Sequence, residues 1–247
     1  MIDIITPVII DVIKWIIPHG FIELQNRIKQ RPLREFYNNL GNPIYLVFPP
    51  RDMDNILPGT HIFDLMGAME LQDRLIPLGY AFERRRSNLI SERDLQQGII
   101  SIGGPISNKI SRSLLSTAER RYGIVYKFGG ADNHTIVNTV ENEPAYKPSF
   151  QRNRKNLVEV DYGIVTRIKN PYDLTKKHDA IIVAGSFGWG TQACLRVISD
   201  IDSLKYIMKK VKSRPPYFQA VCMTQVDEDG VPLTPELVKE SIVEISG

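Results

Sequence analysis

The stretch DAIIVAGSFGWGTQACLRVISD, residues 179–200, decides the fold class. It opens on a nearly continuous apolar run, which is typical of a strand buried on both faces of a sheet. A glycine-rich turn at residues 184–191 follows, and apolar residues then recur at helical spacing. The stretch therefore predicts a strand, a tight turn and a helix in succession, which is the repeating unit of α/β proteins.

The same alternation appears earlier in the chain. Apolar runs at 44–48 and 99–102 predict buried strands, and a helical pattern follows each of them, at about 60–79 and 109–122. Between the first helix and the second of these strands, YAFER predicts a short strand and ISERDLQQ a short helix. These elements predict a Rossmann-like, mostly parallel sheet with helices on both faces. Period-two runs at 123–169 predict an antiparallel β-ribbon insertion. Beyond residue 200 we expect a helix to about 212, a strand at 217–226, and a terminal helix or helix plus strand in TPELVKESIVEI.

Length and composition indicate one folded core. The chain has 247 residues, 43% of them apolar, so it can bury one substantial core or one core with a small appendage. Gly41, Asn42 and Pro43 cannot continue a helix and mark a boundary. We therefore predict an N-terminal amphipathic and basic segment, residues 1–42, followed by a single α/β domain, residues 43–247.

The N-terminal segment is the most apolar part of the chain. Its unbroken run between Pro7 and Pro18 has about ten residues and spans roughly 15 Å as a helix, against about 30 Å for a bilayer core. Three interpretations fit its apolar face. The face packs on its own domain or on a dimer partner, or it lies in a membrane interface together with the basic residues up to 34, or it spans a membrane through oligomerisation.

Charge, cysteine and histidine content narrow the function classes. A net charge of +3 argues against a nucleic-acid-binding protein. Cys194 and Cys222 lie in apolar contexts without CxxC spacing, which favours a reducing, cytoplasmic setting, with membrane-peripheral contact only through residues 1–34. The four histidines show no paired spacing, so we expect no metal site, and no cofactor follows from the sequence.

The second glycine-rich turn (residues 184–191) lacks a residue that each of three named motifs requires. Thr191 stands where a P-loop needs lysine, and the dinucleotide fingerprint lacks an acidic residue about 20 positions on. The nucleophile-elbow spacing around Ser186 lacks a later histidine, because the last histidine is His178. The interpretations that remain are a turn required for packing and a turn whose amides bind an anion.

The first glycine-rich turn (residues 103–108) also leaves an apolar strand and enters a helix. In open α/β sheets ligands bind at that edge, where glycine amides and helix N-termini favour a phosphate. Amides at Gly104, Ser186 and Gly190 are expected to cradle the phosphate, and Arg112 is expected to supply positive charge. The full set of predicted ligand-binding residues is Gly103, Gly104, Asn108, Arg112, Gly185, Ser186, Gly188, Gly190 and Thr191.

Two further polar groups accompany these turns. Arg84, Arg85 and Arg86 form a basic cluster, for which a solvated charge run is the simpler interpretation. Carboxylates flank the first strand and the helix after it, where they are suited to binding ribose or to acid–base chemistry. These carboxylates are Asp52, Asp54, Asp64 and Glu70, and Asp64 and Glu70 are the candidate catalytic residues.

The segments IISIGGPISNKISRSLL and AIIVAGSFGWGTQACLRVI resemble the glycine-rich turns of Rossmannoid nucleotide-sensing domains, the SLOG-like group related to nucleoside deoxyribosyltransferases. The resemblance covers the two turns and the strand order from about 44 to 121, and it implies binding of a nucleotide or nucleotide-derived signal. Some members cleave an N-glycosidic bond with a carboxylate nucleophile. DYGIVTRIKNPYD and the turn after it also look like a module of uncharacterised bacterial and archaeal proteins.

Three functional hypotheses follow from the sequence. The first is a sensor or effector that binds a nucleotide or another phosphate-bearing small molecule at the two glycine-rich turns. The second is an N-glycosidic hydrolase or transferase acting on nucleosides or NAD-like substrates. The third is a membrane-peripheral interaction or scaffold protein, a homo-oligomer among the options, in which the turns serve packing alone.

Overall fold

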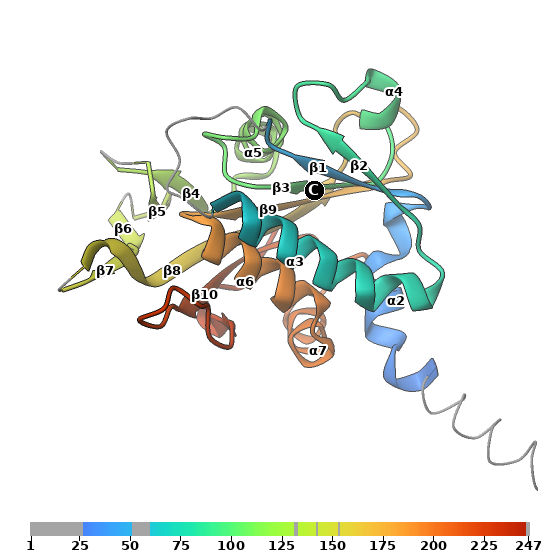
Figure 1. Cartoon of the computed structure of the whole chain (residues 1–247). Coiled ribbons are helices and arrows are strands. Elements are labelled where there is room, and N and C mark those ends of the chain that lie inside the picture. Colours follow the sequence, from blue (N-terminus) through green and yellow to red (C-terminus); the bar gives the residue numbers. More distant parts are fainter. Residues whose placement is uncertain (1–26, 51–59, 131–132, 142, 153, 246–247) are drawn as a thin grey trace, which may run out of the picture.

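The chain folds as a mixed α/β protein, described here by a computed structural model that covers residues 27–50, 60–130, 133–141, 143–152 and 154–245. A large sheet forms the middle layer, and helices lie on its two faces (Figure 1). Along its main path the strand order is β11-β10-β8-β9-β3-β1-β2, with β7 and β12 paired at its margins. Four neighbouring strands run parallel: β2 (Phe82–Arg86), β1 (Ile44–Phe48), β3 (Ile99–Ile102) and β9 (Asp179–Gly185).

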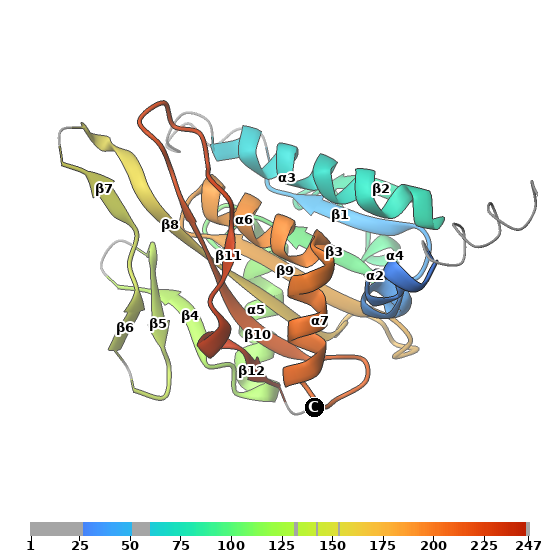
Figure 2. The same cartoon turned by 90° about the horizontal axis from the view of Figure 1, so that it is seen from below.

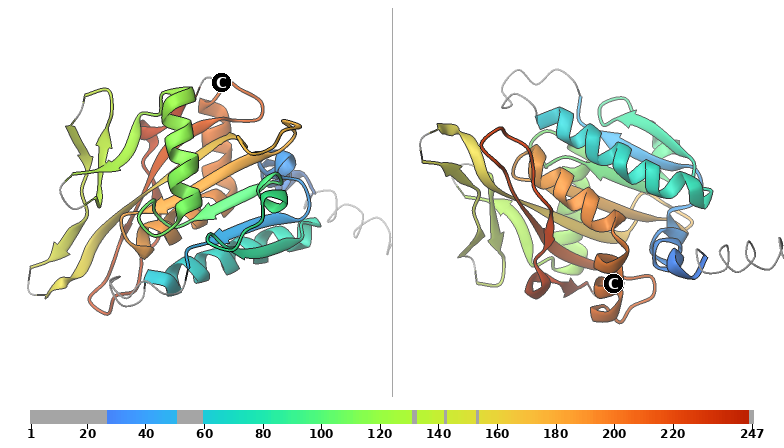
Figure 3. Two further views of the ribbon diagram at one scale, coloured as in Figure 1. Left: turned by 90° about the horizontal axis from the view of Figure 1, so that it is seen from above. Right: turned by 60° about the horizontal axis from the view of Figure 1, so that its bottom comes forward.

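Helices cover both faces of the sheet (Figure 3). One face carries α3 (Thr60–Leu75), α6 (Gly188–Ser199) and α7 (Ile201–Lys210), and the other carries α5 (Lys109–Tyr122). The core on each side follows the period-two alternation of strand residues: Ile181 and Val183 pack with the first set of helices, and Ala180 and Ile182 pack with α5. The continuous apolar run of β9 is therefore explained by burial on both faces.

The predicted ribbon at 123–169 is found only in part as a separate unit. β4 (Tyr126–Gly129), β5 (Thr135–Asn138) and β6 (Glu143–Tyr146) form a small antiparallel sheet beside the main one (Figure 2). β7 (Ser149–Gln151) and β8 (Arg154–Lys169) instead join the large sheet, where β8 pairs antiparallel with both β9 and β10 (Phe218–Gln225). The second half of β8 is buried, so this strand is part of the core.

Two predictions for the C-terminal third need correction. The predicted single helix after the second glycine-rich turn is two helices, because Asp200 adopts an extended conformation and its side chain caps α7 by accepting from the Ser203 amide at 2.8 Å. The predicted terminal helix does not form. Residues there pair with β10 as β11 (Glu236–Leu237) and β12 (Val243–Glu244), joined by a 3₁₀ turn at Lys239–Ser241.

Helix α2 (Arg31–Tyr37), followed by a 3₁₀ turn at Asn38–Leu40, belongs to the packed structure, because Leu33, Phe36, Tyr37 and Leu40 are buried in the core. The domain boundary at residue 42 stays a prediction, and residues 1–26 lie outside the described residues. Across the described ranges, no helix combines the length and the apolar composition that crossing a membrane requires.

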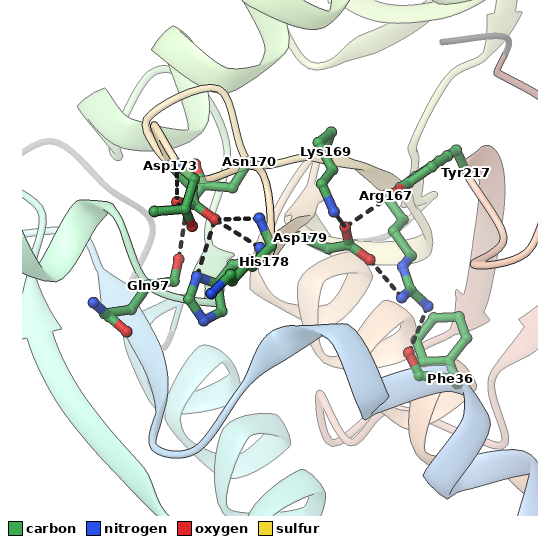
Figure 4. A network of polar contacts seen from close by, with 11 residues as sticks. Phe36, Gln97, Arg167, Lys169, Asn170, Asp173, His178, Asp179 and Tyr217 are labelled. Carbon is green, nitrogen blue, oxygen red and sulfur yellow. Dashed lines mark hydrogen bonds and ion pairs between the residues drawn. The ribbon is translucent and has the colours of Figure 1, made fainter.

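A buried polar network ties α2 to the start of β9 (Figure 4). Arg167 is fully buried, donates to the Phe36 carbonyl, and pairs with Asp179 at 2.7 Å. Lys169 and the Tyr217 hydroxyl also donate to Asp179, each at 3.1 Å. Because one fully buried carboxylate receives all three donors, the network fixes the amino-terminal edge of the sheet.

Beside it, a second cluster holds the loop between β8 and β9. Asp173 accepts from three backbone amides, from the Thr175 hydroxyl and from the ring of His178 (Figure 4). Asn170 donates to the carbonyls of Leu95 and Gln97, at and just after the end of α4 (Glu92–Leu95). These bonds hold the β8–β9 loop against the segment that leads from α4 into β3.

Candidate functional site

The two glycine-rich turns lie next to each other at the carboxyl edge of the parallel strands. β3 and β9 pair directly, with Ile102 opposite Val183, so the turns that follow them emerge side by side. A Cβ atom added to Gly104 would lie 3.3 Å from the carbonyl oxygen of Gly185, so the two turns are in contact. The structure therefore brings the predicted residues of both turns into one region.

Close backbone packing accounts for two glycines of the second turn. A Cβ atom on Gly185 would lie 2.2 Å from the Phe187 oxygen, and one on Gly190 would lie 2.2 Å from the Tyr162 oxygen. Across the same contact, a Cβ on Gly163 of β8 would lie 2.6 Å from the Gly190 oxygen. Helix α6 therefore rests on β8 backbone to backbone, and no side chain fits at these positions. Gly188 is the first residue of α6 and is buried.

The amides of this turn already have acceptors within the chain. The Ser186 amide donates to the Tyr162 carbonyl at 2.8 Å, and the Gly185 amide donates to the Thr191 hydroxyl at 3.1 Å. The Gly190 amide donates to the carboxylate of Asp161 at 2.5 Å, and the Phe187 amide reaches the same carboxylate at 3.3 Å. A carboxylate from β8 therefore occupies the place at the N-terminus of α6 where a phosphate was expected.

Asp161 is a residue that sequence reasoning missed. It is fully buried, and burial raises its pKa to about 7, against the opposing effect of the amides of Gly190, Tyr162 and Phe187. The one available signal was an acidic residue within the mostly apolar stretch VDYGIV of β8, two positions before Gly163. A charged residue at such a position needs a specific partner, and the α6 N-terminus is that partner.

Asp64, one of the two predicted catalytic carboxylates, reaches the same region from α3. It is 6% exposed, and its Oδ1 atom has no hydrogen-bond partner among the described residues. Burial raises its pKa to about 7, a hydrogen bond from Thr191 opposes that rise, and the nearby charge of Asp161 adds to it. Two buried carboxyl groups with raised pKa values thus lie near each other beside the second turn.

Glu70, the other candidate, lies six residues further along α3, about 9 Å along the helix axis. Its carboxylate receives two hydrogen bonds from Arg196, at 2.6 and 2.7 Å, and one from Gln192 at 3.1 Å. The bonded Arg196 guanidinium lowers its pKa. Glu70 lines an open groove of about 1130 Å³ between α2, α3 and α7 and is not grouped with the two turns.

The first turn is held by its own side chains. Gly103 has a φ of 95°, which favours glycine. Asn108 caps α5 by accepting from the Ile110 amide at 2.9 Å, and it donates to the ends of two strands, at Val47 and Ile102. Asn108 therefore shapes the edge of the sheet from a buried position. Arg112 is exposed and folds back onto the carbonyls of residues 105 and 106 at 2.7 and 3.1 Å.

Ser186 and His134 are hydrogen-bonded to each other, but the imidazole does not accept a proton from the serine hydroxyl as a catalytic base would. The Ser186 hydroxyl donates to the main-chain carbonyl of His134 at 2.5 Å, and the ring Nδ1 of His134 lies 2.8 Å from the Ser186 carbonyl. The imidazole stacks on Phe187 with ring centroids 4.5 Å apart. These contacts fasten the second turn to the small sheet.

The remaining predicted groups lie elsewhere. On the edge strand β2, Arg84 donates to Gln72 and Arg85 pairs with Asp94 and Glu83, so the basic cluster is partly neutralised. The described part of the chain contains no group of His, Cys, Asp and Glu side chains suited to a metal ion. Cys194 and Cys222 are buried and free, and Asp52 and Asp54 lie outside the described residues.

Comparisons of the sequence with models of known protein families and with curated proteins gave no match. The geometry of the carboxyl edge is therefore the basis for assigning a function to this chain.

Proposed function

We propose that the chain binds a nucleoside or nucleotide at the carboxyl edge of its parallel strands, next to the ends of β1 and β3. The order β2-β1-β3-β9 corresponds to the 2-1-3-4 order of one common class of doubly wound sheets. In such sheets the strand order reverses between the first and third strands, and ligands bind in the crevice at that point. The first glycine-rich turn and the start of α3 flank this point.

The observation that carries the proposal is the buried carboxylate of Asp64, whose Oδ1 atom has no hydrogen-bond partner in the part of the chain that the structure describes. A buried carboxylate oxygen is costly unless a donor reaches it. The paired hydroxyls of a ribose supply such donors. Contacts run from Asp64 to Thr191, from Thr191 to Gly185, and from Gly185 to Gly104, so a ligand at Asp64 lies near both turns.

The phosphate contacts differ from those expected from the sequence. The Ser186 and Gly190 amides already donate within the chain. In our proposal the phosphate of a nucleotide lies against the first turn, where Arg112 supplies the nearby positive charge. The ligand then extends from Asp64 towards residues 103–108. In this proposal the protein acts as a sensor or effector, as the first of the three sequence-based hypotheses states.

The carboxyl pair favours an N-glycosidic hydrolase or transferase as a second candidate function. Asp64 and Asp161 both have pKa values raised to about 7, so near neutral pH one can hold a proton while the other is ionised. Cleavage of a glycosidic bond uses a carboxylic acid and a carboxylate in this way. Asp161 is bound by three backbone amides, so in this candidate function Asp64 is the group that meets the substrate, and the nearby charge of Asp161 raises the pKa of Asp64.

Calorimetric titration with a panel of nucleosides and nucleotides tests the binding proposal. Asp64→Asn keeps the shape of the side chain and removes its charge, so we expect binding to weaken by about 10- to 100-fold, the effect of losing a hydrogen bond to a charged group. Glu70→Gln makes the same change on the same helix outside the site and is expected to leave affinity unaltered. If Asp64→Asn binds as the wild type does, the proposal is wrong.

The pH dependence of binding gives a second readout. Because the hydroxyl donors need ionised Asp64, whose pKa is about 7, affinity is expected to rise about tenfold between pH 6 and pH 8. The Asp64→Asn variant should lose that dependence. Release of free base during incubation, measured by chromatography, separates the enzymatic function from binding alone.

A further inference from the structure

Helix α3 and the 3₁₀ turn that follows it (Ile76–Leu78) present a row of large apolar side chains to solvent. Ile62, Leu65, Met66, Met69 and Ile76 are between 40% and 55% exposed, and their spacing places them on one side of the helix. We name these five residues the α3 stripe. The opposite side of α3 is fully buried in the core through Ala68, Leu71 and Leu75. Figure 3 shows α3 on the outer surface of the helical layer.

A solvent-facing row of large apolar side chains on a helix whose opposite side is already in the core indicates a second packing surface on that helix. The α3 stripe exposes roughly 400 Å² of apolar surface, as large as the main patch of a typical monomer. A stable dimer buries about 800 Å² on each partner, so the stripe supplies about half of what association with a second copy needs. A segment tethered to the same chain needs less area, because its effective concentration is high.

The chain has such a segment. Residues 8–17, VIIDVIKWII, carry an apolar face of Val8, Ile9, Val12, Ile13, Trp15 and Ile16, and they lie outside the described residues. The described chain starts at Arg27, and Lys29 and Gln30 line the same groove as Asp73 and Arg74 at the C-terminal end of α3. The nine residues between 17 and 27 reach at most about 30 Å, and the stripe is about 21 Å long.

We propose that residues 8–17 of this chain pack along the α3 stripe. The two apolar surfaces then cover each other within one molecule. The stripe begins two residues before Asp64, so this contact also supports, from outside, the part of α3 that carries the candidate ligand-binding carboxylate.

Oxidation by hydrogen peroxide, followed by mass spectrometry, tests the contact in the full chain. We expect Met66 and Met69 to be oxidised several-fold faster in an Ile9→Asp, Ile13→Asp double variant than in the wild type. Lys14→Asp introduces the same charge on the polar side of the segment and is expected to leave both rates unchanged. Buried Met208 reports whether each variant stays folded.

A reciprocal measurement follows the segment itself. In a Trp189→Phe background Trp15 is the single tryptophan, and Met66→Glu with Met69→Glu should increase its quenching by acrylamide. Leu174→Glu changes an 82% exposed leucine outside the stripe and serves as the control. Equal oxidation rates in wild type and double variant overturn the proposal. Protection that grows with protein concentration, or that needs phospholipid vesicles, overturns it in favour of a second copy or a lipid surface.

Discussion

Replacement of Gly190 by alanine separates the two interpretations of the second glycine-rich turn. Gly190 is the third residue of α6 and does not have a positive φ, so alanine is compatible with its backbone. If nothing obstructed the new methyl group, the higher helix propensity of alanine would stabilise the protein by about 1 kcal/mol. The helix propensity alone therefore predicts a gain in stability.

The structure predicts the opposite sign. The added Cβ would lie 2.2 Å from the carbonyl oxygen of Tyr162 and 2.7 Å from its carbon, so α6 must move away from β8 by about 1 Å. Overpacking of this kind costs about 1–3 kcal/mol, and weakening the charge-assisted bond from the Gly190 amide to Asp161 costs about 1.5–3 kcal/mol more. We expect a net loss of about 2–5 kcal/mol.

Denaturant unfolding followed by circular dichroism measures this change. Gly104→Ala is the matched control, because its Cβ would meet only the Gly185 oxygen at 3.3 Å, and we expect it to stay within about 1 kcal/mol of the wild type. A Gly190→Ala variant as stable as the wild type would refute the close packing of α6 on β8.

Three further predictions concern charged side chains. Burial raises the pKa of Asp161 from 3.8 to about 7, so its contribution to stability is present below pH 3.8 and is lost as the pH rises through 7. The Asp161→Asn variant should therefore lose roughly 4 kcal/mol of the pH dependence of the unfolding free energy, measured between pH 4 and pH 8. Asp179→Ala leaves buried Arg167 without its carboxylate and should cost about 3–5 kcal/mol in the same assay. Glu70→Gln breaks a partly exposed ion pair and should cost less than about 1 kcal/mol, which thermal unfolding checks.

The strand–turn–helix units were predictable from local pattern. Continuous apolar runs gave β1, β3 and β9, because burial on both faces leaves no alternation of polar residues. The caps of α4 and α5, Ser91 and Asn108, each supply a side-chain acceptor just before a helical pattern, which is a local signal.

Features that depend on distant pairings were not predictable. Asp161 and Gly190 are 29 residues apart, and nothing in either neighbourhood shows that a strand carboxylate caps α6. The place of β10 beside β8 likewise follows from pairing between strands that are not consecutive, because β9 lies between them in the sequence. The terminal segment looked helical from its spacing, but pairing with β10 prevailed over that preference.

For the candidate site, the sequence predicted the edge of the sheet at which both glycine-rich turns lie, and it named one of the two buried carboxylates beside the second turn. Asp64 and Glu70 are equivalent in a sequence, because both lie on the helix that follows β1. The structure distinguishes them through their neighbours: Arg196 binds Glu70, whereas Asp64 faces Thr191 beside the second turn.

A crystal structure of the protein with the tightest-binding compound of the nucleoside and nucleotide panel tests the proposed site most directly. We predict ligand density next to the carboxyl ends of β1 and β3, with a sugar hydroxyl within hydrogen-bond distance of Asp64 and any phosphate against residues 103–108. Density in the groove lined by Glu70 and Arg74, or a ligand that makes no contact with Asp64, would contradict the account.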